Sequence, residues 1–156
     1  MAKNFYGHGR LAYMVLDTET ATLPFADEIA KGDVNKKKKI AIARPLIYDI
    51  GYTICFRDGT IIEKKSFLVS EIFSVPSIFN TAYYAGKRPL YIEMLRREEI
   101  TVLPWNDIMK IFLQDLAKVD AVGAFNAMFD FKKAIPFTEL YIKQLYGNGF
   151  YEWMEI

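Results

Sequence analysis

The chain has 156 residues, of which 52% are hydrophobic and 25% are charged. This composition excludes a disordered chain and predicts a single globular domain over residues 1–156 with a sizeable apolar core. The formal net charge is +1, so nucleic-acid binding would have to come from local basic patches. The one cysteine, Cys55, lies in an apolar run, which predicts a buried thiol in a reducing compartment.

The sequence indicates no association with a membrane. No apolar stretch reaches the length of a membrane span, and residues 1–5 lack the apolar core of a signal peptide. We therefore expect a cytoplasmic protein.

The first predicted strand is the apolar run Leu11–Leu16, which leads into Asp17, Thr18, Glu19 and Thr20. An uninterrupted apolar run is typical of a central strand that helices cover on both faces. Residues i and i+2 of a strand point to the same side, so Asp17 and Glu19 would face one way at its end. Two such carboxylates favour a hard cation, Mg²⁺ or Mn²⁺. An ordinary turn at a strand end is the alternative.

Residues 20–45 predict a basic loop insertion, with lysines at positions 36–39. Two interpretations stay open for these lysines. They are either solvated or contact phosphates beside the first strand.

Two antiparallel strands are predicted next, at Leu46–Phe56 and Ile61–Val69. The pair Asp58-Gly59 between them favours a tight hairpin turn. Charges at positions 63–65 predict an exposed or edge strand. Gly51, inside a strand, indicates a bulge or a close backbone approach.

The stretch Ser70–Ile100 predicts helices broken at Pro76 and Pro89. Its middle interleaves aromatic and basic side chains, which we interpret as a candidate nucleic-acid surface: Tyr83, Tyr84, Lys87 and Arg88. The alternative is a helix that buries its tyrosines and ends at a solvated Lys-Arg pair.

The last third of the chain predicts a helix from Pro104, a short strand at Ala121–Phe125, and helical segments at 127–135 and 138–146 separated by Pro136. The apolar residues of the first helix recur at helical spacing, which predicts a core-facing side: Trp105, Ile108, Met109, Phe112 and Leu116.

Two motifs carry a resemblance to a known family. Asp17-Thr-Glu19-Thr resembles the first motif of the DnaQ-like (DEDD) 3′–5′ exonucleases, and Asn126-Ala-Met-Phe129-Asp130 resembles the second. Asp49-Ile-Gly51 is similar to their second strand, and the chain looks most like the exonucleases of phages and prophages. The resemblance implies an α/β fold of the ribonuclease H-like type, a mixed sheet flanked by helices.

The resemblance also implies the chemistry. Phosphodiester hydrolysis at the 3′ ends of single-stranded DNA or RNA would use two Mg²⁺ or Mn²⁺ ions. Asp17 would contact both metals, Glu19 the metal that activates water, and Asp130 the second. Phe129 would anchor Asp130 in the core. Further contacts to the substrate end are expected from Thr18, Thr20 and Asn126. The alternatives are that either threonine simply finishes the strand and that Asn126 supports the second motif.

The chain departs from the family in one respect. Members complete the site with a C-terminal helix that carries a fourth carboxylate and a His or Tyr base, whereas no Asp follows Asp130 and the single histidine is His8. We therefore expect a chain that stops short of that helix, with impaired hydrolysis. The aromatic tail at 150–154 would then lie beside an uncovered groove and favour a homodimer.

The alternative function is an inactive nucleic-acid-binding or interaction module that keeps the fold without the chemistry. The sequence does not distinguish DNA from RNA or identify a polymerase partner.

Overall fold

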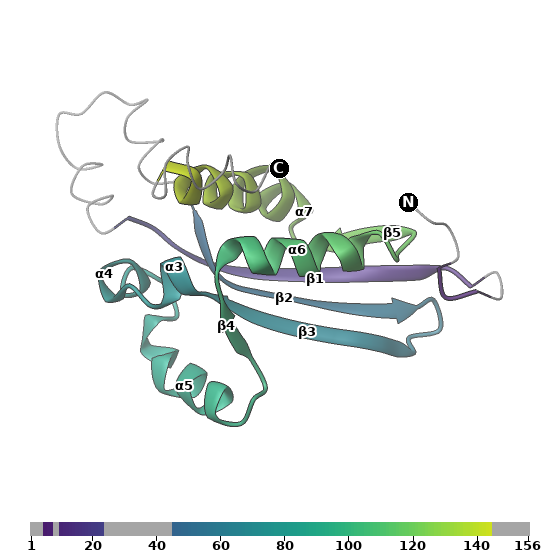
Figure 1. Cartoon of the computed structure of the whole chain (residues 1–156), viewed down its shortest axis with the longest axis horizontal. Helices are drawn as coiled ribbons and strands as arrows, with labels where there is room; N and C mark the ends of the chain where they lie inside the picture. The colour runs from purple at the N-terminus through teal and green to yellow at the C-terminus, as the bar shows by residue number, and fades with distance from the viewer. Residues whose placement is uncertain (1–4, 8–9, 24–44, 145–156) are drawn as a thin grey trace.

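The computed structural model describes residues 5–7, 10–23 and 45–144, and these form an α/β arrangement around a five-stranded mixed sheet (Figure 1). The strand order is β4-β3-β2-β1-β5. The basic loop at 24–44, His8 and the aromatic tail lie outside the described residues. The strands are β1 (Ala12–Ala21), β2 (Leu46–Phe56), β3 (Ile61–Val69), β4 (Thr101–Leu103) and β5 (Ala121–Ala124).

Strands β1, β2 and β3 form an antiparallel meander, and the short strands lie parallel at its two edges. The predicted hairpin turn is confirmed: Gly59 adopts a φ of +90°, and its N–H donates to the Phe56 carbonyl at 2.9 Å. At the edges, β5 pairs with β1, and β4 pairs with the end of β3. Sequence analysis did not anticipate β4.

The sheet buries one of its faces. Met14 and Leu16 of β1 are almost fully buried, whereas Val15 between them is 53% exposed. We call the side of Met14 and Leu16 the closed face and the side of Val15 the open face. Helix α6 lies against the sheet in Figure 1 and supplies Ile108 and Phe112 to the core. The prediction that helices cover both faces of the first strand is therefore wrong for the described residues, because the apolar run packs on one side only.

The first strand is also longer than predicted. It continues past Leu16 to Ala21, so Asp17 and Glu19 lie within a strand and not at its end. The register of β1 against β2 shifts between Glu19 and Thr20, whereas Gly51 sits in regular pairing opposite Asp17. Of the two interpretations of Gly51, the close approach is the one observed, because a Cβ there would lie 3.2 Å from the Ser66 hydroxyl oxygen.

The helices between β3 and β5 begin at the residues expected to break them. Pro76 opens α4, and Pro89 occupies the first turn of α5, where a missing N–H removes no helical hydrogen bond. The bounds are α3 (Ser70–Phe73), α4 (Pro76–Phe79), η1 (Ala85–Lys87), α5 (Arg88–Arg96) and α6 (Trp105–Leu116).

Helix α6 is fixed at its N-terminus by a carboxylate from another helix. The N–H of Trp105 donates to Glu71 Oε1 at 2.9 Å, and Glu71 is itself buried on α3. An anion at this position satisfies a backbone donor that the helix leaves unpaired and complements the helix dipole. The core-facing side predicted for this helix is confirmed, with Trp105, Ile108 and Phe112 buried and the others partly buried.

The helical segment after β5 is continuous, in contrast to the predicted break at Pro136. It consists of α7 (Ala127–Phe129), a π-helical turn η2 (Asp130–Ala134) and a helix over residues 135–144. Pro136 has no N–H to donate to the preceding turn, and the wider π turn sits where that hydrogen bond is missing. The Thr138 hydroxyl accepts from the N–H of Ile47 at 2.9 Å, which ties this helix to β2.

No helix within residues 5–7, 10–23 and 45–144 is both long enough and apolar enough to cross a membrane.

Candidate active site

The pairing of β1 with β2 brings three carboxylates together on the open face. Asp17 lies opposite Gly51, and Glu19 lies opposite Asp49. Directly paired residues of an antiparallel sheet point to the same side, and so do residues i and i+2. Asp17, Glu19 and Asp49 therefore share one face, and we call them the open-face carboxylates.

Asp49 is the member that sequence analysis missed as a site residue. Its Oδ2 accepts a hydrogen bond from the Tyr91 hydroxyl of α5 at 2.9 Å. The pKa of Asp49 is raised from 3.8 to about 6. Burial is the largest cause, the Tyr91 hydrogen bond acts against it, and the negative charge of Asp17 adds to it. The available signal was its place in Asp49-Ile-Gly51, one strand over from Glu19, but the pairing register was needed to use it.

Glu19 responds to the same concentration of negative charge. Burial raises the pKa of Glu19 above its usual value, and Asp17, Asp49 and Asp130 raise it further. Lys87 acts in the opposite direction. Neither the Asp17 carboxylate nor the Glu19 carboxylate forms a hydrogen bond or ion pair with another described residue. These two carboxylates are therefore close enough to other acids to be repelled by them, and no described Lys or Arg side chain forms an ion pair with either.

Asp130 is held differently. Its side chain is buried, with a relative exposure of 5%, and Oδ1 accepts a hydrogen bond from the Thr18 hydroxyl at 2.5 Å. Thr18 alternates with Asp17 along β1, so its side chain points to the closed face. In the structure the Thr18 hydroxyl supports Asp130, and a contact of Thr18 to the terminal nucleotide stays a prediction. Asp130 also opens the π-helical turn, a feature frequent at functional sites.

The other residues of the second motif have structural roles. The Asn126 side chain accepts from the N–H of Phe129 at 3.3 Å and caps α7, which is the supporting role foreseen for it. Phe129 packs against the core, as predicted. Thr20 is partly buried beside the register shift of β1.

The described residues contain no preformed metal cage. Nowhere in them do three His, Cys, Asp or Glu side chains converge as a ligand set. The donor chemistry nevertheless suits a hard divalent cation, because Asp17 and Glu19 offer unpaired carboxylate oxygens on one face.

The aromatic and basic segment lies at the same end of β1. The N–H of Thr22, just after β1, donates to the Thr81 hydroxyl at 2.8 Å. Tyr83 is 91% exposed and meets Tyr84 edge to face at 4.9 Å between centroids. Lys87 Nζ lies 4.2 Å from the Tyr84 ring centroid. This segment therefore presents an aromatic surface and a cation near Glu19.

Arg88 points away from that surface. Its guanidinium carbon lies 5.3 and 5.4 Å from the ring centroids of Phe73 and Phe79, two core residues. Arg88 therefore packs against the aromatic core of α3 and α4.

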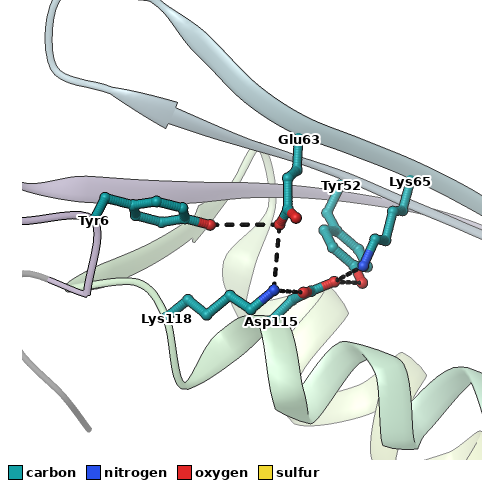
Figure 2. Close-up of polar contacts among 6 residues, drawn as sticks. All are labelled: Tyr6, Tyr52, Glu63, Lys65, Asp115 and Lys118. Carbon is teal, nitrogen blue, oxygen red and sulfur yellow. Dashed lines mark hydrogen bonds and ion pairs between the residues drawn. The ribbon is translucent and has the colours of Figure 1, made fainter.

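A second carboxylate cluster lies on the closed face and is fully neutralised (Figure 2). Asp115 of α6 is 1% exposed and accepts from the Tyr52 hydroxyl at 2.5 Å, from Lys65 Nζ at 2.7 Å and from Lys118 Nζ at 3.0 Å. Glu63 lies 3.7 Å from Lys118 Nζ and accepts from the Tyr6 hydroxyl at 3.4 Å. We call this set the Asp115 cluster.

Comparison with models of known families, with curated proteins and with solved structures gave no match. The function is therefore argued from the residues and their arrangement.

Proposed function

We propose that this chain is a DnaQ-like 3′–5′ exonuclease domain with a ribonuclease H-like fold. The two resembling motifs support the proposal, and so does the sheet topology. The resemblance implies a mixed sheet flanked by helices, and a five-stranded sheet with both antiparallel and parallel pairs agrees with it.

The observation that carries the proposal is the open-face carboxylates. Asp17, Glu19 and Asp49 lie on neighbouring positions of two central strands. The pKa values of Glu19 and Asp49 are both raised. A stable fold gains nothing from mutually repelling acids without a cation. Such an arrangement is typical of a site that binds a positive ion or positively charged group.

Asp17 and Glu19 would hold the divalent cations, with Asp49 as the third carboxylate of the open face. Bound Mg²⁺ or Mn²⁺ would supply an activated water and neutralise charge on the phosphate. Asp130 lies near Glu19 but meets Thr18 on the closed face, so it would have to turn from Thr18 toward the open face to contact a cation. Tyr83 would stack a base while Lys87 contacts a phosphate, so that a single-stranded end meets the carboxylates.

The test measures metal binding and hydrolysis in the same protein. We expect millimolar Mn²⁺ to raise the melting temperature of the wild type and to support slow release of nucleotides from 3′-labelled single-stranded DNA or RNA. Asp17→Asn should lose both effects. Asp107→Asn, an exposed acid in the first turn of α6, serves as the matched control and should retain them.

The outcomes separate the two candidate functions. Mn²⁺ stabilisation and oligonucleotide binding without any hydrolysis would favour the inactive nucleic-acid-binding module. A melting temperature that ignores Mn²⁺ in the wild type, or that responds equally in Asp17→Asn, would contradict the metal site itself.

A further inference from the structure

A groove on the open face leads away from the carboxylates. It has a volume of 310 Å³ and is lined by the acids Asp17 and Asp49 and by the cationic and hydroxyl-bearing residues Thr53, Lys64 and Ser66. Val15, Gly51, Tyr52 and Lys65 complete the lining. One concave surface therefore joins the proposed active site to a cationic and hydroxyl-bearing patch on β3.

The pairing register shows how the groove is laid out. Asp17, Gly51 and Ser66 form one row across β1, β2 and β3. The next row on the same face is Val15, Thr53 and Lys64. Rows on one face are two residues apart, about 6.6 Å along the strands. The donors of β3 thus lie beside the carboxylates on the same surface.

The cationic and hydroxyl-bearing side chains of the groove are free to bind a ligand. The side chains of Thr53, Lys64 and Ser66 form no hydrogen bond or ion pair with any described residue. Lys65, the next residue of β3, points to the closed face and is paired with Asp115 at 2.7 Å. The two consecutive lysines therefore have different surroundings. Lys65 neutralises the buried Asp115, and Lys64 lines the open groove.

Gly51 forms the floor between Asp17 and Ser66. A Cβ at this position would lie 3.2 Å from Ser66 Oγ and 3.5 Å from the Lys65 carbonyl oxygen. Any larger side chain would therefore fill the groove between Asp17 and Ser66. Glycine at this position therefore accommodates the close approach of Ser66 and keeps the floor of the groove free of a side chain.

We propose that this groove binds a phosphate of the substrate strand next to the scissile one, with Lys64 as the charge partner and Ser66 and Thr53 as hydroxyl donors. An ammonium and two hydroxyls beside a flat floor match a phosphodiester group. This inference rests on the proposed exonuclease function, because the scissile phosphate would lie at the open-face carboxylates.

The test measures binding without hydrolysis. Fluorescence anisotropy of a labelled single-stranded oligonucleotide, titrated in EDTA at several salt concentrations, gives the affinity and its salt dependence. Lys64→Ala should weaken binding about fivefold at 0.1 M salt and reduce the slope of log K against log salt by about 0.7, the change for one phosphate contact on a single strand. Lys110→Ala removes the same charge from the exposed side of α6 and is the control.

A second variant tests the groove independently of charge. Gly51→Val should weaken oligonucleotide binding by filling the floor, and the Ser66 hydroxyl must shift by a few tenths of an ångström to admit its Cβ. The melting temperature of each variant in EDTA confirms that it is folded. Mn²⁺ stabilisation should persist in Lys64→Ala, because Lys64 is not a metal ligand.

The outcomes separate this inference from the proposed function. Wild-type binding that Lys64→Ala and Lys110→Ala reduce equally would overturn the groove and leave the exonuclease site intact. A wild type that binds neither Mn²⁺ nor oligonucleotide would overturn both. Undiminished binding in folded Gly51→Val would also overturn the groove as the phosphate site.

Discussion

The two faces of the central sheet each hold a cluster of acids, and the clusters differ in how their charge is balanced. On the closed face, burial disfavours the charged form of Asp115. The hydrogen bonds from Lys65, Tyr52 and Lys118 outweigh this effect and hold the pKa of Asp115 below its usual value. On the open face, burial is the largest cause that raises the pKa of Asp49 to about 6, and the Tyr91 hydrogen bond only partly offsets it. One carboxylate is stabilised as an anion by its partners, and the other is left short of positive charge.

This difference distinguishes a structural cluster from the proposed functional site. The Asp115 cluster joins α6 to β2 and β3 and is complete without any ligand. The open-face carboxylates are completed only by something that the chain does not supply among its described residues. Perturbed acids of this kind concentrate at functional sites.

Removing the Asp115 carboxylate from the closed face should have the largest effect on stability. Asp115→Ala leaves the buried Tyr52 hydroxyl and two ammonium groups without their acceptor, so we expect a loss of about 2–4 kcal/mol, which allows for the partial exposure of both lysines. Urea denaturation measures it. Asp107→Ala, in the exposed first turn of the same helix, should lose less than about 1 kcal/mol. An equal loss in the two variants would show that the Asp115 cluster is no more stabilising than a surface acid.

Neutralising Asp49 should change the free energy of unfolding in the opposite direction, toward greater stability. Its folded pKa of about 6 exceeds the usual 3.8, so the charged form destabilises the metal-free fold. This cost is absent below about pH 4, grows as the pH rises through about 6, and is then complete. Asp49→Asn should therefore be more stable than the wild type at pH 7, by on the order of 1–3 kcal/mol, and equally stable near pH 4.

Urea denaturation in EDTA between pH 4 and pH 7 measures this difference, and subtracting the two curves removes the contribution of every other acid. Asparagine keeps an oxygen for the Tyr91 hydroxyl, so the substitution changes charge and little else. A variant that is less stable than the wild type at pH 7 would place Asp49 with the structural acids.

Asp17→Asn should have the smallest effect. Asp17 is exposed and forms no hydrogen bond with a described residue, so its loss should change the unfolding free energy by less than about 0.5 kcal/mol, with any change toward greater stability. Thermal unfolding in EDTA measures it. A loss above about 1 kcal/mol would make Asp17 a structural residue and remove the contrast between the two faces.

The local sequence was sufficient for features that depend on neighbours along the chain. The Asp58-Gly59 turn, the buried side of α6, the short strand β5 and the cap at Asn126 were all predicted and are observed. The i, i+2 spacing alone places Asp17 and Glu19 on one side of a strand. Each of these follows from the turn preference, periodicity or spacing of a few consecutive residues.

Only the tertiary structure decided which of these residues meet. Asp49 joins Glu19 through the register of β1 with β2, and Lys64 and Lys65 are assigned to opposite faces by the register of β2 with β3. Among the described residues, the exposure of Val15 on β1 and the continuous helix through Pro136 depend likewise on long-range packing. A shift of one residue in a register would exchange the faces, and no local pattern specifies which partner strand lies alongside. The sequence thus indicated most of the elements and the shared side of Asp17 and Glu19, whereas strand pairing brought Asp49 to the candidate site.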